Sequence, residues 1–114
     1  MREARIILPL ADNDGKPVDT AHEYLKGRLC RLFGGFTATP VMGGWMDDSG
    51  RLYEDRSIAY DVAMEDTYEN ARKVGSIAEI AGQMAKQLAM YVRLPNGNVQ
   101  ILNIEPAAEA AKAA

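Results

Sequence analysis

The sequence predicts an α+β sandwich, a mostly antiparallel sheet with two helices packed on one of its faces. Two observations predict this class. Apolar residues recur at helical spacing in two segments, and the segments around them show the alternation and turn signals of strands. The order β-α-β-β-α-β-β favours a ferredoxin-like split β-α-β topology. We expect residues 1–105 to form a single domain and the alanine-rich residues 106–114 to form a flexible tail.

The first strand is expected at Arg5–Leu10, where apolar side chains alternate before an Asn-Asp-Gly turn. Thr20 and Glu23 have the spacing of a capping box, so we expect the first helix to begin there. Gly34-Gly35 is expected to end this helix, because glycine enters the left-handed conformation without penalty. The residues expected to face the core are Ala21, Tyr24, Leu25, Leu29, Leu32 and Phe33.

A long hairpin is expected next. Phe36–Met42 has the composition of a strand, and we expect Gly43-Gly44 to bend or bulge it before Trp45-Met46 continues. Asp47–Gly50 has strong turn chemistry, and the returning strand shows strict alternation over Ser57–Glu65. On that strand Ile58, Tyr60, Val62 and Met64 face one side, and Ala59, Asp61 and Ala63 face the other.

The second helix is expected to follow the capping residues Asp66–Glu69 and to run to about Leu88. Gly75 and Gly82 should each weaken it by roughly 1 kcal/mol relative to alanine. The small residues along this helix would let it sit close to a sheet. A last hairpin is expected around the turn Pro95–Asn98.

Charge and composition disfavour several classes of function. The chain has 13 basic and 16 acidic residues and no basic block, so we expect no binding to nucleic acid. The apolar run near the N-terminus is too short for a signal peptide or a membrane span. With its single cysteine, Cys30, the chain cannot form an internal disulfide. We therefore expect a cytoplasmic protein that does not associate with membranes.

No catalytic or cofactor motif is present in the sequence. One histidine and one cysteine are too few for a zinc-type metal site, and no phosphate-binding or dinucleotide motif occurs. We therefore expect no metal and no cofactor. We expect His22 to be an exposed residue at a helix start and Cys30 to be a buried small hydrophobic residue.

Two hypotheses of function remain, and they differ in class. The first is a binding protein that self-associates, as a homodimer or higher homo-oligomer, through the sheet face that the helices leave open. Trp45, Tyr53 and Tyr91 are candidates to project there, and the partner could also be a host protein or a small ligand.

The alternative is a small cofactor-free enzyme of the dimeric α+β barrel type that uses a carboxylate near the tryptophan. Such an enzyme would need a partly polar pocket that holds an acid with a raised pKa. The candidate binding residues are Trp45, Asp47, Glu54, Arg56 and Tyr60. Without a catalytic constellation in the sequence, we favour the binding protein over the enzyme.

The chain also resembles a group of small uncharacterised proteins of bacteriophages and bacteria. The resemblance rests on a G-G-x-T segment at Gly34, Gly35 and Thr37, and on a G-x-W-x-D-x-x-G-x-L hairpin. The hairpin residues are Gly44, Trp45, Asp47, Gly50 and Leu52. The resemblance implies a phage or bacterial accessory protein that works in a bacterial cytoplasm, and it implies no activity.

Overall fold

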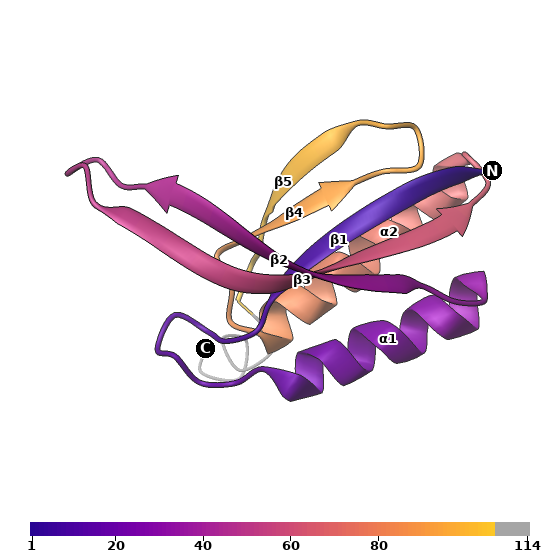
Figure 1. The fold of residues 1–114 in the computed structure, drawn as a ribbon. Helices are drawn as coiled ribbons and strands as arrows, with labels where there is room; N and C mark the ends of the chain where they lie inside the picture. Colours follow the sequence, from indigo (N-terminus) through magenta and orange to yellow (C-terminus); the bar gives the residue numbers. More distant parts are fainter. Residues whose placement is uncertain (107–114) are drawn as a thin grey trace.

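A computed structural model describes residues 1–106 of the chain. Five strands form one antiparallel sheet in the order β2-β3-β1-β4-β5, and two helices cover one of its faces (Figure 1). The predicted α+β class, the element order and the ferredoxin-like arrangement are confirmed, with β5 added at one edge. The elements are β1 (Arg2–Pro9), α1 (Asp19–Phe33), β2 (Thr37–Met46), β3 (Leu52–Met64), α2 (Tyr68–Met84), β4 (Ala89–Arg93) and β5 (Val99–Asn103).

The core lies between the sheet and the two helices. Alternate residues of β1 and β3 point into it, which is the face predicted for Tyr60 and Val62. Leu25 and Leu29 of α1 and a stripe of α2 around Val74 and Ala78 close the core from the other side. The opposite face of the sheet carries no helix, and we call it the open face (Figure 1).

Helix α1 begins without the predicted capping box. Its N-cap is Val18, no side chain caps it, and Thr20 already lies in the first turn. The helix end is as predicted: Gly34 has φ 92°, and its N–H donates to the carbonyl oxygen of Cys30. The chain enters α1 from a short loop that is closed by an isolated bridge between Ala11 and Pro17.

Two predictions on α1 are wrong, since His22 is buried, only 6% exposed, and Cys30 is exposed. Val18, His22, Leu25 and Leu29 are separated by four, three and four residues, the spacing of one helix face. His22 is therefore part of the core-facing stripe. Cys30 follows Leu29 directly and so turns about 100° away from that stripe.

Strands β2 and β3 form one unbroken hairpin that extends beyond the rest of the sheet (Figure 1). Their register runs from Thr37 opposite Asp61 to Met46 opposite Leu52 with no residue unpaired. The register therefore excludes a bulge at Gly43-Gly44, and the two pieces predicted for the first strand of the hairpin form one continuous strand. We call residues 42–56 the arm; the predicted turn at Asp47–Gly50 lies at its tip, where Gly50 has φ 86°.

Helix α2 starts close to the predicted position, with Thr67 as N-cap, whose hydroxyl accepts from the Asn70 N–H at 3.0 Å. It ends at Met84, four residues earlier than predicted, because Lys86 adopts a left-handed φ of 53° and turns the chain into β4. The final hairpin turn is confirmed, with Gly97 at φ 94°. Most of the predicted flexible tail, residues 107–114, lies outside the described residues.

Candidate functional site

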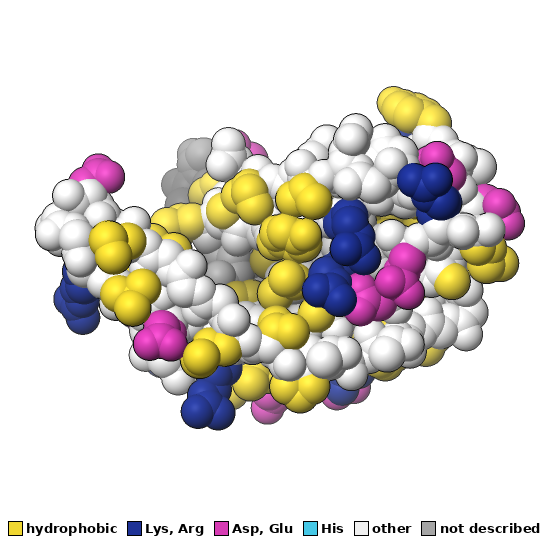
Figure 2. All heavy atoms as spheres, turned by 45° about the horizontal axis from the view of Figure 1, so that its top comes forward, with side chains coloured by type: hydrophobic (Ala, Val, Ile, Leu, Met, Phe, Trp, Pro, Cys, Tyr) yellow, Lys and Arg dark blue, Asp and Glu magenta, His cyan; other side chains and the backbone are white. Residues whose placement is uncertain are grey.

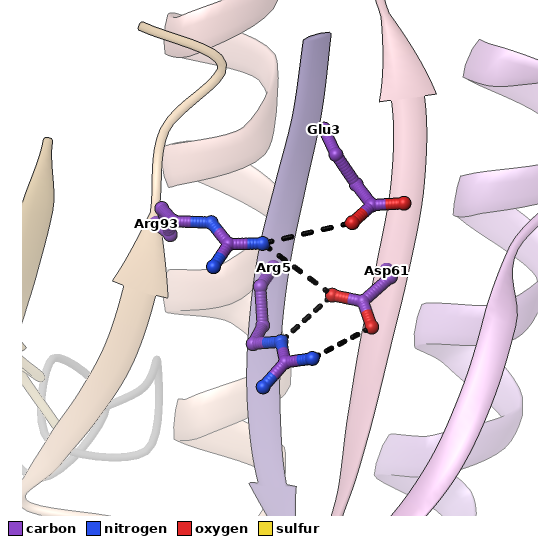
Figure 3. A network of polar contacts seen from close by, with 4 residues as sticks. All are labelled: Glu3, Arg5, Asp61 and Arg93. Carbon is purple, nitrogen blue, oxygen red and sulfur yellow. Dashed lines mark hydrogen bonds and ion pairs between the residues drawn. The ribbon is translucent and has the colours of Figure 1, made fainter. Parts of the chain in front are cut away.

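Four charged side chains form a network at the centre of the open face (Figure 3). Arg5 of β1 donates two hydrogen bonds to Asp61 of β3, at 2.7 and 2.9 Å, in a bidentate pair. Arg93 of β4 lies 3.8 Å from Asp61 and 3.7 Å from Glu3. The bond to Asp61 raises the pKa of the Arg5 guanidinium. The network therefore ties three neighbouring strands together through side chains on one face.

Apolar side chains surround this network on the open face. Register places Ile7, Tyr91 and Ile101 side by side across β1, β4 and β5. Ile101 is 62% exposed, and Val99 beside it is also exposed. Figure 2 shows hydrophobic side chains gathered next to a small group of basic and acidic ones, with a hollow between them and the projecting arm.

The arm carries the tryptophan outside the core. Trp45 is 54% exposed and stacks on Tyr53, with ring centroids 4.4 Å apart. The unbroken register puts both rings, and Tyr91, on the face predicted for them. Met42, Met46 and Leu52 are exposed on the reverse side of the arm.

Asp47 organises the turn at the arm's tip. Its carboxylate accepts from the Ser49 hydroxyl at 2.6 Å, from the N–H groups of Ser49 and Arg51, and from the Tyr53 hydroxyl at 3.0 Å. The Ser49 hydroxyl bond is the largest of the effects that lower the pKa of Asp47. A carboxylate with a lowered pKa does not match the raised pKa required of the barrel-type enzyme.

A polar pocket lies on the other side of the sheet, between α1 and the β2–β3 pair. It is a pocket of about 290 Å³, with apolar walls from Leu10, Ala38 and Ile58. The buried residues His22 and Tyr60 also line it. Its charged residues all come from α1: Asp19, Glu23 and Lys26.

Tyr60 and His22 are bonded to each other in this pocket. The Tyr60 hydroxyl lies 2.6 Å from His22 Nδ1, and His22 Nε2 lies 2.8 Å from the carbonyl oxygen of Pro9. Burial raises the pKa of Tyr60 to about 12, and the charge of Glu23 acts in the same direction. Tyr60 therefore stays protonated at neutral pH.

The structure divides the five candidate residues among separate places. Trp45 and Asp47 lie together at the arm, where both contact Tyr53. Glu54 and Arg56 are exposed along the arm, opposite Gly44 and Met42. Tyr60 is buried in the pocket, seven residues or about 23 Å along β3 from Tyr53. These residues do not converge on one site within a single chain.

Sequence reasoning missed most residues of these sites: Asp19, His22, Glu23 and Lys26 of the pocket, and Glu3, Arg5 and Arg93 of the network. His22 could have been found from its place in the helical stripe. Arg5 and Arg93 could not, because their meeting with Asp61 depends on the strand order β3-β1-β4. Among residues 1–106, no group of three or more His, Cys, Asp and Glu side chains is placed to hold a metal ion. In the same part of the chain, no helix combines the length and apolarity needed to cross a membrane.

Fold and site together define a class: a small ferredoxin-like α+β sandwich with a fifth strand, a projecting arm and a polar pocket beside α1. Within this class the chain is similar to a phage SAM lyase in its apo state, with 15% identity and a TM-score of 0.70 over 92% of this chain and 90% of that one. A phage SAM lyase in complex with S-methyl-5'-thioadenosine gives 17% identity and a TM-score of 0.69 over 90% and 89%. No family model and no curated protein matches the sequence. At these identities the likeness establishes the fold.

Proposed function

We propose that this protein is a phage-type enzyme that cleaves S-adenosylmethionine and releases S-methyl-5'-thioadenosine. The observation that carries the proposal is the likeness to phage SAM lyases over nine-tenths of both chains, with no extra domain needed for the match. The neighbours' phage origin agrees with the accessory role that the sequence resemblance implies.

The chemistry of this reaction fits a chain without a catalytic constellation. The bond that breaks joins the sulfonium sulfur to the aminocarboxypropyl chain, and its electron pair goes to sulfur, which leaves as a neutral thioether. The carbon that loses sulfur is attacked by the substrate's own carboxylate, which closes a lactone. Neither step needs a protein base or nucleophile. The protein has to bind the substrate folded for attack and exclude water, which are effects of orientation.

The pocket beside α1 offers groups suited to this cationic substrate. Glu23 and Asp19 outnumber Lys26 among its charged residues, and this excess of negative charge favours a sulfonium. Tyr60 adds an aromatic ring and a polar oxygen. At about 290 Å³ the pocket is at the lower limit of ligand sites, roughly 300–1,000 Å³, so one chain would enclose only part of the nucleoside.

Purified protein incubated with S-adenosylmethionine is expected to produce S-methyl-5'-thioadenosine and a four-carbon lactone, measured by mass spectrometry. Glu23→Gln should lower kcat/KM about two- to threefold, because one negative charge near the sulfonium is lost; the effect is small since Glu23 is 76% exposed and lies 3.6 Å from Lys26 Nζ. Glu79→Gln, an exposed residue of α2 outside the pocket, is the matched control and should leave the rate unchanged. Absence of the thioadenosine product would overturn the proposal. An alkene in place of the lactone would show that the substrate is cleaved by elimination and not by substitution.

The exposed apolar side chains favour a second proposal, that copies of this chain associate through the open face and the arm. Val99 and Ile101 are exposed at one edge of this face, and Trp45 is exposed on the arm. A second copy presents the same apolar groups and would cover them.

Native mass spectrometry is expected to show a multiple of the 12.5 kDa chain mass. Ile101→Lys should shift this population to monomer, because it buries a charge in the interface. Leu88→Lys introduces the same charge at a residue after α2 that is 78% exposed, and it should not change the oligomeric state. A wild-type monomer at micromolar concentration would refute self-association.

A further inference from the structure

The direction of the hydrogen bonds in the His22–Tyr60 pair follows from its geometry. The Pro9 carbonyl oxygen can only accept, so His22 Nε2, at 2.8 Å, must carry a proton and donate it. In the neutral imidazole Nδ1 is then unprotonated and accepts. The Tyr60 hydroxyl, 2.6 Å from Nδ1, must therefore donate its only proton to His22.

This arrangement determines what the pocket can offer a ligand. Both ring nitrogens of His22 are used within the protein, so the histidine has no hydrogen-bonding capacity left. Tyr60 keeps one free capacity, the remaining lone pair of its oxygen, which can only accept. Leu10, Ala38 and Ile58 add apolar side chains around it. Beside these apolar residues Tyr60 thus offers an acceptor, and the charged donor that lines the pocket is Lys26.

We infer that His22 is a positioning residue: by holding the Tyr60 proton it makes Tyr60 a hydrogen-bond acceptor, and the pocket selects ligands that bring an N–H or O–H donor.

The charged groups that face the pair are few. Asp19, Glu23 and Lys26 of α1 line the pocket, whereas its lining residues from β2, from β3 other than Tyr60, and from the segment after β1 are apolar. The identity of the donor ligand, a nucleoside with ribose hydroxyls and an amino group, rests on the proposed function.

Nitrogen-15 NMR tests the pair without any ligand. The chain has one histidine, so its ring signals need no assignment by mutation. For the neutral ring we expect a protonated Nε2 and an unprotonated Nδ1. Protonation at Nδ1 in the neutral ring would overturn the inference.

Binding of S-methyl-5'-thioadenosine, measured by calorimetry, tests the consequence with two matched variants. The amide of His22→Asn reaches the position of Nδ1 and can still accept from Tyr60, whereas that of His22→Gln reaches Nε2 and cannot. We expect His22→Gln and Tyr60→Phe to bind about tenfold more weakly and His22→Asn to bind nearly as well as wild type.

Equal weakening of binding by His22→Asn and His22→Gln would count against the positioning role. If the wild type binds no thioadenosine but shows the expected Nε2–H form, the proposed function fails and the inference on the pair stands. If the wild type binds thioadenosine but its neutral ring is protonated at Nδ1, the inference on the pair fails and the proposed function stands.

Discussion

Replacing Asp61 with alanine is expected to lower the free energy of unfolding by about 2–3 kcal/mol, because two charge-assisted hydrogen bonds to Arg5 are lost. The Asp61 side chain is only 11% exposed, so water replaces these bonds poorly. The change also leaves Arg5 directly opposite Arg93 in the β1–β4 register with no carboxylate between them. Chemical denaturation at neutral pH measures the effect.

Glu3→Gln is the matched control for Asp61. Glu3 contacts the same network, but its side chain is 59% exposed and its one ion pair with Arg93 is 3.7 Å long. Exposed pairs of this kind contribute little, so we expect a change below about 1 kcal/mol that vanishes in high salt. The loss caused by Asp61→Ala should persist in salt. Equal effects of the two substitutions would show that the bidentate pair does not stabilise the sheet.

The second large effect concerns two glycines of α2 that respond in opposite directions to alanine. Gly75 has open space where a Cβ would stand, so Gly75→Ala should raise stability by up to about 1 kcal/mol through helix propensity. A Cβ on Gly82 would lie 2.8 Å from Met90 Cγ and 3.0 Å from Ile104 Cδ1. Gly82→Ala should therefore cost about 1–3 kcal/mol in overpacking and lower stability overall.

Thermal unfolding of both variants measures the cost of overpacking at Gly82, because both variants gain the same helix propensity and only Gly82→Ala meets a close contact. A second comparison tests the contact itself. With Met90→Ala in the background, the cost of Gly82→Ala should shrink, because the nearest atom is gone and the two changes are not additive. Two alanine variants of equal stability would mean that α2 does not lie this close to β4.

The candidate site contains some features that the sequence could predict and others that it could not. Asp47 was a candidate acid, and its sequence context already offered a turn role, which the four bonds to its carboxylate now account for. Tyr60 was assigned to the correct face by alternation alone. Its partner His22 was placed in solvent, because the prediction weighed the residue type and the helix start above the spacing to Leu25 and Leu29.

The sequence by itself determined the elements whose causes are local. Gly34, Gly50 and Gly97 take the positive φ that their turns require, and alternation along β3 settled which side chains meet the helices. Tertiary structure decided what depends on neighbours far along the chain. The strand order joins Arg5, Asp61 and Arg93, and pairing with β3 keeps the Gly43-Gly44 segment extended. Packing against β4 leaves no space for a Cβ at Gly82, whereas Gly75 has open space. The sequence could not show this difference, because the close approach of two elements depends on the side chains that meet between them and not on local helix propensity.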